Sequence, residues 1–186
     1  DAPFLSLPAS AQTKAQQLLA PFSGHPFVVL FPGASIAERR WGAARFNQVT
    51  ARFAKHCYGV AVVGSMDDTT TGTAIITAAT GLNLAGQTSL TETAAIIERA
   101  ALLISGDSGV LHLGVGFGTP TVSLFGPGIA KKWAPRGQQH RVLNHHLPCS
   151  PCTKFGYTQK CPHHAKCMKE ITSDEVFQAA MVLLQK

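Results

Sequence analysis

The order of apolar and polar segments predicts an α/β fold, a Rossmann-like doubly wound parallel sheet with helices on both faces. Short apolar runs, such as 27–31 and 59–64, alternate with segments in which apolar residues recur at helical spacing. Such alternation is typical of parallel sheets covered by helices. The runs are apolar at nearly every position, as expected for strands buried on both faces. The 186 residues fit one domain, 1–186.

The first half of the chain is expected to contain three strands with helices between them. Phe46, Val49 and Phe53 recur at helical spacing after the first strand, and a glycine, Gly64, closes the second strand. The expected elements are a helix over 9–20, a strand over 27–31, a helix over 43–57 that contains Cys57, a strand over 59–64, a helix over 69–79 and a strand over 82–84.

The second half continues this alternation. Ser89 and Glu92 have the spacing of a capping box, in which each side chain accepts a hydrogen bond from a backbone N–H at the start of a helix. Thr172 or Ser173 is expected to cap the last helix. The expected elements are a helix from Ser89 to about Ala100, a strand over 102–105, a helix that opens at 106–109 and ends near Gly116, strands over 121–125 and 141–143, and a C-terminal helix over 174–185.

The composition is that of an ordinary globular protein, with 45% hydrophobic and 14% charged residues. No apolar run approaches the roughly 20 residues that cross a bilayer, and residues 1–4 lack the basic start of a signal peptide. The formal charge of +6 favours an anionic partner. Because the basic residues are dispersed and not interleaved with aromatic residues, a phosphorylated small molecule fits better than a nucleic acid.

The loops that follow the predicted strands are the expected place of a ligand, because an open parallel sheet binds its ligand beyond the carboxyl ends of its strands. These loops are 32–41, 64–68, 85–89, 106–112 and 126–133, and they are rich in Gly, Ser, Thr and charged residues. The rule holds for any fold of this kind, so it locates a site without identifying its ligand.

The loop over 106–112 has the strongest pattern. A strand leads through a glycine-containing turn directly into a helix, whose free N–H groups and positive dipole end can bind phosphate. Gly109 has no side chain to keep a phosphate away, and Ser108 and His112, four residues apart, share one helix face. Asp107 is expected to cap the helix or to hold a sugar hydroxyl. The alternative is that Asp107 and Ser108 are only caps and that His112 is a core residue.

A second group of candidates follows the first strand. An arginine there, Arg39, could neutralise a diphosphate and stabilise it as it leaves a sugar. The alternative is that Arg39 and Arg40, being adjacent, form only a solvated surface. Trp41 is expected to be a packing anchor rather than a platform for stacking.

Taken together, these loops resemble those of glycosyltransferase family 9, which includes the lipopolysaccharide heptosyltransferases. The similarity extends from about residue 25 to the C-terminal helix, and the Asp-Ser-Gly-x-x-His block with its downstream Phe-Gly-Pro is specific as a combination. The segments that carry the resemblance are 31–35, 39–41, 45–46, 84–90, 107–113, 118–121 and 124–127.

The resemblance implies a GT-B architecture, in which two Rossmann-like domains enclose the active site, and identifies this chain as the C-terminal, donor-binding half. The residues that it implies for the nucleotide-sugar donor, typically ADP-heptose, are Ser35, Arg39, Asp68, Thr88, Asp107, Ser108, Gly109 and His112. Arg39 takes the place of a family Lys, and Asp68 that of a Glu that binds the donor sugar or the ribose. An Arg is a planar fork and a Lys a point charge, so the geometry at Arg39 is expected to differ.

The family's catalytic base, which deprotonates the acceptor hydroxyl, is an Asp of the N-terminal domain, which also binds most of the lipid-linked saccharide acceptor. The chain is therefore expected to lack that domain and to be inactive alone. The whole protein is expected to transfer the sugar with inversion and without a metal, since fixed cations and helix amides can stabilise the departing diphosphate. Family members are cytoplasmic and act at the inner membrane face, where a positive charge favours docking.

The segment 149–167 is rich in cysteine. Cys149, Cys152, Cys161 and Cys167 have the number required for a tetrahedral zinc site, although their spacing matches no standard zinc finger. Free thiols and two disulfides are the alternatives, and a reducing compartment disfavours the disulfides. A structural zinc site is therefore one prediction for this tail, with no catalytic role.

Two other functions stay open at this point. One is a non-catalytic nucleotide-binding module that regulates or scaffolds a partner, and the other is a nucleotide-sugar epimerase of related two-domain fold. Arg39 and His112 together favour the glycosyltransferase, because plain nucleotide binding needs the helix amides but not this polar set. An epimerase is expected to prefer UDP compounds.

Overall fold

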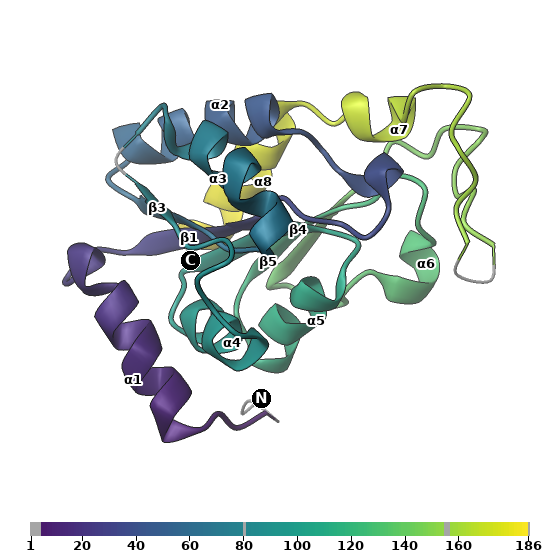
Figure 1. Cartoon of the computed structure of the whole chain (residues 1–186). Helices are drawn as coiled ribbons and strands as arrows, with labels where there is room; N and C mark the ends of the chain where they lie inside the picture. Colours follow the sequence, from purple (N-terminus) through teal and green to yellow (C-terminus); the bar gives the residue numbers. More distant parts are fainter. Residues whose placement is uncertain (1–4, 80, 155–156, 186) are drawn as a thin grey trace.

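The computed structural model describes residues 5–79, 81–154 and 157–185 (Figure 1). One sheet of six parallel strands runs through these residues, in the order β3-β2-β1-β4-β5-β6. The strands are β1 (Phe27–Phe31), β2 (Gly59–Val62), β3 (Gly81–Asn83), β4 (Leu102–Gly106), β5 (Thr121–Leu124) and β6 (His140–Leu143). The predicted fold class, a doubly wound parallel sheet, is confirmed. The prediction that there is no signal peptide was based on residues 1–4, which lie outside the described residues.

Helices cover both faces of the sheet, with α2, α3 and α8 on one face and α1, α4 and α5 on the other (Figure 1). The helices are α1 (Ala9–Leu18), α2 (Ala43–Lys55), α3 (Thr69–Ile76), α4 (Leu90–Glu98), α5 (Gly109–Gly116), α6 (Ala130–Trp133), α7 (Lys166–Lys169) and α8 (Ser173–Leu184). Single 3-10 turns add η1 (Ala20–Phe22), η2 (Ala37–Arg39) and η3 (Met66–Asp68). None of the helices in the described part of the chain has the length and hydropathy to span a bilayer.

Every strand and long helix that the sequence predicts is present, and the capping predictions for α4 and α8 are confirmed. Ser89 accepts a hydrogen bond from Glu92 N, and Thr172, rather than Ser173, caps α8. The prediction for Cys57 was wrong: α2 ends at Lys55, and Cys57 follows it in the left-handed region with φ 61°. The short helices α6 and α7 were not predicted, because one turn of helix has no apolar period to detect.

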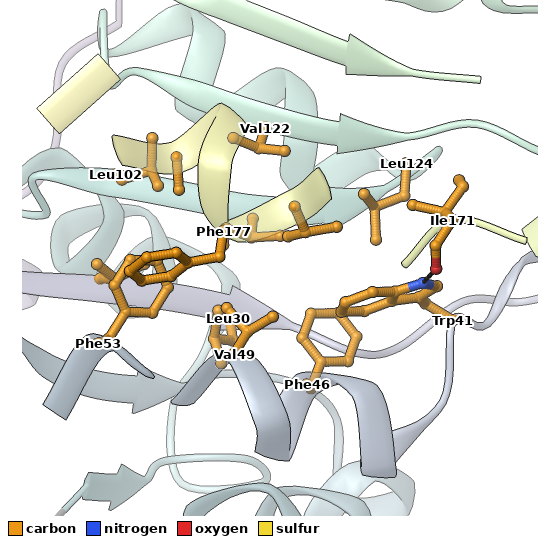
Figure 2. Close-up of a cluster of buried hydrophobic side chains, with 14 of the residues drawn as sticks. Leu30, Trp41, Phe46, Val49, Phe53, Leu102, Val122, Leu124, Ile171 and Phe177 are labelled. Atoms are coloured by element: carbon orange, nitrogen blue, oxygen red, sulfur yellow. Dashed lines mark hydrogen bonds between the residues drawn. The ribbon is translucent and has the colours of Figure 1, made fainter. Parts of the chain in front are cut away.

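The strands are buried on both faces, which explains why their sequences are continuously apolar. Successive side chains point to opposite faces, so Val28 and Leu30 join one hydrophobic cluster while Phe27 and Val29 join the other. Figure 2 shows the first cluster, in which Phe177 of α8 packs between the strands and α2. The core thus holds α8, in the last part of the chain, against α2 and against strands β4, β5 and β6.

Trp41 is the packing anchor that the sequence predicts. Its side chain is buried, its ring meets that of Phe46 edge-on at 4.8 Å, and its indole N–H donates to the carbonyl of Ile171 at 2.8 Å (Figure 2). Ile171 precedes α8, whereas Trp41 belongs to the loop after β1. The hydrogen bond therefore joins the loop of the first strand to the end of the chain.

Candidate functional site

A cavity of about 1380 Å³ opens at the carboxyl ends of the strands, where the sheet order places the loops that follow β1 and β4 side by side. This is the point at which the strand order reverses, the usual ligand position in such sheets. All the donor-site residues implied by the resemblance line this one cavity: Ser35, Arg39, Asp68, Thr88, Asp107, Ser108, Gly109 and His112. Their positions around one cavity would allow all of them to contact the same ligand. The role of each residue stays a prediction.

The start of α5 presents an open helix end to the cavity. Ser108 caps it, since the serine hydroxyl accepts from Leu111 N at 3.3 Å and also shares a hydrogen bond with Ser105 at 2.9 Å. A Cβ at Gly109 would meet no atom within 4 Å, so the space beside this residue, which lines the cavity, is open. The remaining amides and the positive dipole end suit a phosphate.

His112 lies one turn further along α5 and is exposed to the cavity. Its ring centroid is 6.3 Å from that of Trp133, the last residue of α6. The alternative interpretation, in which His112 is a core histidine, is therefore wrong. An exposed imidazole beside a helix end can donate a hydrogen bond to an anionic ligand.

Arg39 is held inside the cavity by an ion pair rather than lying in solvent. Its Nη1 atom is 3.1 Å from Asp107 Oδ2, and the two side chains are only 17% and 10% exposed. Arg39 Nη2 also donates to Thr153 Oγ1 at 3.4 Å. Of the adjacent pair of arginines, only Arg40 is well exposed, at 42% of its side chain. The solvated-surface interpretation was therefore wrong for Arg39.

Asp107 pairs with this arginine instead of capping α5, which Ser108 does. The room for its carboxylate comes from Gly128, where an added Cβ would lie 2.1 Å from Asp107 Oδ2. The guanidinium has five N–H donors, and its Nε is buried without a hydrogen-bond partner among the described residues. Arg39 can therefore keep its contact with Asp107 and still offer N–H groups to an anion.

Asp68 is a buried carboxylate with one free oxygen. Its Oδ2 accepts from the backbone N–H and the hydroxyl of Ser65, at 3.0 and 2.8 Å. Its Oδ1 is buried, lies 3.8 Å from Arg40 Nη1, and has no hydrogen-bond partner in the described chain. Buried polar atoms without partners are rare in native proteins. This oxygen thus has hydrogen-bonding capacity that no group of the described chain uses.

The remaining predicted residues, Thr88 and Ser35, also line the cavity. The Thr88 hydroxyl shares a hydrogen bond of 2.8 Å with Thr93, so it is already engaged within the protein. Ser35 is exposed after β1. Both side chains can add a hydrogen bond to a ligand, but neither holds another residue of the site in place.

Sequence reasoning did not single out four further residues of the cavity: Lys132, Trp133, Thr153 and Lys154. The first two follow β5, inside the predicted ligand-facing loop 126–133, and an aromatic residue next to lysines there was the available signal. Thr153 and Lys154 belong to the cysteine-rich tail, and nothing in their local sequence indicates that the tail folds back over the sheet.

The four tail cysteines come together in a separate cavity of about 320 Å³. Burial raises the pKa of Cys152 and of Cys167, and the neighbouring Cys161 adds to the effect on Cys152. All five cysteines are free thiols, so the disulfide alternative is absent from this structure. Within the described ranges, no three His, Cys, Asp or Glu side chains are arranged to hold a metal ion. A zinc site at Cys149, Cys152, Cys161 and Cys167 stays a prediction.

Comparisons with known sequences agree with this geometry. A family model described as "Glycosyltransferase family 9 (heptosyltransferase)" matches residues 4–163. Lipooligosaccharide heptosyltransferase 2 of Campylobacter jejuni is 29% identical over 190 residues, which cover 98% of this chain and 58% of that protein. Lipopolysaccharide heptosyltransferase 2 of Escherichia coli is 27% identical over 128 residues, which cover 65% of this chain and 37% of the relative.

Solved structures show the same fold. The E. coli ADP-heptose lipopolysaccharide heptosyltransferase II superposes with a TM-score of 0.79 at 23% identity, covering 97% of this chain and 53% of the other. A family 9 glycosyltransferase of Veillonella parvula gives a TM-score of 0.80 at 23% identity, covering 98% and 54%. The chain spans about half the length of these proteins, as expected of one Rossmann-like half of a GT-B enzyme.

Proposed function

This chain belongs to glycosyltransferase family 9, the heptosyltransferase family, and we propose that it binds the nucleotide-diphosphate-sugar donor for an inverting glycosyl transfer. ADP-heptose is the proposed donor, and a lipid-linked saccharide of the lipopolysaccharide core is the proposed acceptor. The observation that carries the proposal is that a helix N-terminus, a largely buried arginine and a carboxylate oxygen without a hydrogen-bond partner in the described chain converge on one cavity.

The diphosphate is proposed to lie at the start of α5. The open N–H groups after Ser108 and the positive dipole end favour a phosphate there. Arg39, with a partly unused guanidinium, then supplies the positive charge that stabilises the departing diphosphate. His112, exposed on the same face of the helix, adds a further donor.

The ribose or the donor sugar is proposed to use Asp68. Its Oδ1 has no hydrogen-bond partner among the described residues, and a hydroxyl that donates to a carboxylate forms a strong, charge-assisted hydrogen bond. The shorter Asp, in place of the Glu of the family, is accommodated because η3 brings it close to the sheet. A Cβ at Gly33 or Gly64 would lie 2.7 or 2.8 Å from Asp68 atoms, so both glycines make room for this side chain.

The part of the relatives that this chain does not span is proposed to supply the acceptor-binding half and the general base. In that arrangement, the chain alone binds the donor and does not transfer the sugar. The whole protein is proposed to act in the cytoplasm at the periphery of the inner membrane, where the net charge of +6 favours an anionic surface.

Calorimetric titration of the 186-residue chain with ADP and with UDP tests the proposal. We expect ADP to bind in preference to UDP. Arg39→Ala and His112→Ala should each weaken ADP binding about tenfold or more, the usual effect of removing a hydrogen bond to a charged group. Arg99→Ala is the matched control, because Arg99 lies beyond the C-terminal end of α4, away from the cavity.

Two results would count against the proposal. Preference for UDP would favour the epimerase, and unchanged ADP affinity in both cavity variants would favour a nucleotide module that uses the helix amides alone. If neither nucleotide binds at millimolar concentration, the same titration is made on the complete protein, and a lack of binding there rejects the donor site.

A further inference from the structure

Two segments of the cysteine-rich tail run antiparallel beside each other (Figure 1). Lys154 and Tyr157 exchange both of their backbone hydrogen bonds at 2.9 Å, and the hydroxyls of Thr153 and Thr158 share a hydrogen bond of 2.7 Å. This is the pairing of an antiparallel ladder, in which successive side chains point to opposite faces. The paired segments therefore have two faces, one with the threonines and one with their neighbours in the sequence.

The two faces contribute to different cavities. Thr153, on the first face, lines the main cavity and accepts a hydrogen bond from Arg39 Nη2 at 3.4 Å. Cys152, Gln159 and Cys161, which share the second face, line the cavity of about 320 Å³, which we call the cysteine cavity. Because Cys152 is opposite Gln159 in this pairing, Cys161 is its diagonal neighbour. The Cα atoms of such a pair in a regular ladder are about 7–8 Å apart.

A disulfide between Cys152 and Cys161 would need only a small movement of the two segments. Disulfides usually join Cα atoms that are about 4.4–6.8 Å apart, so the segments would have to close by roughly 1–3 Å. Both thiols are free and partly exposed. Cys167, in contrast, is buried against Gly126, where an added Cβ would lie 2.9 Å from its Sγ. An oxidant from solution therefore reaches Cys152 and Cys161 more easily than Cys167.

The cysteine cavity also suits an anionic oxidant. Lys154, Lys160 and Lys166 line it, together with the carboxylate of Glu38. Lys166 is paired with Glu170 at 3.4 Å, whereas Lys154 and Lys160 have no ion-pair partner in the described part of the chain. Glutathione disulfide has more carboxylates than ammonium groups, so this positive charge attracts it.

We propose that Cys152 and Cys161 are a reversible oxidation site, at which glutathione disulfide forms a protein disulfide that changes the contact between the tail and Arg39. One cysteine thiolate attacks a sulfur of glutathione disulfide, which gives a mixed disulfide and releases one glutathione thiolate. The second cysteine thiolate attacks the protein sulfur of the mixed disulfide and releases the second glutathione thiolate. Two cysteines are thus oxidised, glutathione disulfide is reduced to two glutathiones, and the two thiol protons pass to the released thiolates. In a reducing compartment such disulfides are usually transient and act as redox sensors.

The disulfide would act on the η2 turn, which carries Arg39. Thr153, next to Cys152, accepts from Arg39 at 3.4 Å, and Cys161 N donates to Glu38 Oε1 at 3.4 Å. Both distances are longer than the usual range of about 2.7–3.2 Å, so a movement of roughly 1–3 Å is enough to break these hydrogen bonds. Oxidation therefore releases Arg39 from the tail. The inference rests on the proposed function only where ADP binding is measured, because the oxidation itself is measured without ADP.

The test compares the reduced and the oxidised 186-residue chain. The chain is incubated with glutathione or with glutathione disulfide, and mass spectrometry of its peptides identifies the disulfides. We expect the peptides of Cys152 and Cys161 to be joined after oxidation and to separate again with dithiothreitol. Hydrogen exchange then measures the η2 turn, where Arg40 N donates to Ala37 O at 3.0 Å. Oxidation should speed its exchange at least about threefold and weaken ADP binding about two- to tenfold in calorimetry.

Four variants assign these effects. Cys152→Ser and Cys161→Ser should each prevent the disulfide and its effect on ADP affinity. Cys57→Ser is the matched control, because Cys57 is an exposed thiol that follows α2, outside the tail. Thr153→Val tests the path to Arg39: its ADP affinity should already be lowered, and oxidation should lower it no further, since the contact that oxidation breaks is missing.

Each contrary outcome overturns the inference in a recognisable way. A disulfide of Cys149 with Cys152 would reject the assigned pair, and a lasting mixed disulfide with glutathione would show that the two thiols do not meet. Zinc in the purified chain that protects the tail cysteines from oxidation would show a metal site in place of the oxidation site. Unchanged exchange of the η2 turn after oxidation would show that the disulfide does not act on Arg39. If the disulfide forms and changes this exchange but ADP binds neither form, the oxidation site stands and the donor site fails.

Discussion

The loops after β1 and β4 and the tail over 144–172 both line the cavity, yet they are held in place by different means. The β1 and β4 loops start directly at the ends of central strands, and their charged residues pair with each other, as in the contact of Arg39 with Asp107. Ser108 adds an N-cap to α5. The position of this region follows from the sheet itself, since parallel strands end at one common edge.

The tail is held by the residues that it touches. Its backbone reaches the β5 loop, where Thr153 N donates to Pro127 O at 3.0 Å, and the η2 turn, where Cys161 N donates to Glu38 Oε1 at 3.4 Å. His164 and Ala165 adopt left-handed φ values of 51° and 53°, so no regular element continues through them, and the short helix α7 begins only after Ala165. The tail's conformation therefore depends on tertiary contacts.

The difference between these regions indicates which part of the site keeps its geometry when a contact is removed. A loop that is held between a buried strand and a helix keeps its geometry when one contact is lost. A segment whose described part contains one short helix, α7, loses its place with its contacts. We therefore expect changes in the tail to act on the cavity through few residues, above all Thr153, which accepts from Arg39.

The largest effect is expected at the hydrogen bond between Trp41 and Ile171, where the two regions are joined. Trp41→Ala should lower the free energy of unfolding by about 3–5 kcal/mol, because it leaves a large cavity in the core. Trp133→Ala is the matched control, and its half-exposed side chain should change the stability by no more than about 0.5 kcal/mol. Urea unfolding measures both, and equal losses would contradict the core position of Trp41.

The next effect concerns the tail's contact with Arg39. Thr153→Val removes the hydroxyl that accepts from Arg39 Nη2, and we expect ADP binding to weaken about two- to tenfold, because the net value of one hydrogen bond is about 0.5–1.5 kcal/mol. Thr158→Val is the control: its hydroxyl contacts Thr153 at 2.7 Å but not Arg39. Calorimetric titration with ADP measures the affinity of both variants. A larger loss of ADP affinity in Thr158→Val than in Thr153→Val would show that the tail acts by packing alone.

Thiol reactivity tests how firmly the tail is held. In the tail, Cys149 is exposed, whereas Cys167 is buried and burial raises the pKa of its thiol; Cys57, which follows α2, is an exposed thiol outside the tail. Because the thiolate is the reactive form, iodoacetamide at pH 8 should modify the exposed pair at least about tenfold faster than Cys167. Mass spectrometry of timed samples gives the order, and early modification of Cys167 would mean that the tail opens readily from the sheet.

The smallest effect is expected at β6, from which the tail departs. Burial lowers the pKa of His140, whose Nδ1 shares a hydrogen bond of 2.9 Å with Thr121. The unfolded chain therefore takes up a proton at a higher pH than the folded chain, so this histidine favours folding above its ordinary pKa of about 6.5 and less as the pH falls through its folded value.

Urea unfolding between pH 8 and pH 5 measures this dependence. The slope from one histidine is at most about 1.4 kcal/mol per pH unit, and His140→Gln should reduce it. A steeper loss in the variant than in the parent chain would show that His140 is not the group responsible.

The sequence by itself determined the strands, the long helices, their caps and the edge of the sheet at which the site lies. These features depend on the apolar period of each segment and on backbone groups a few residues apart, as in the Ser89–Glu92 capping box. The candidate residues at the start of α5 were found for the same reason, since a strand, a glycine turn and a helix are consecutive in the chain.

Only the tertiary structure decided which charges meet. The pairing of Arg39 with Asp107, the space that Gly128 leaves for that carboxylate, and the contact between Arg39 and Thr153, 114 positions apart, all join distant segments. The place of Trp133 in the cavity was decided in the same way. Such contacts depend on how the sheet and its loops pack in space, so the local sequence pattern does not predict them.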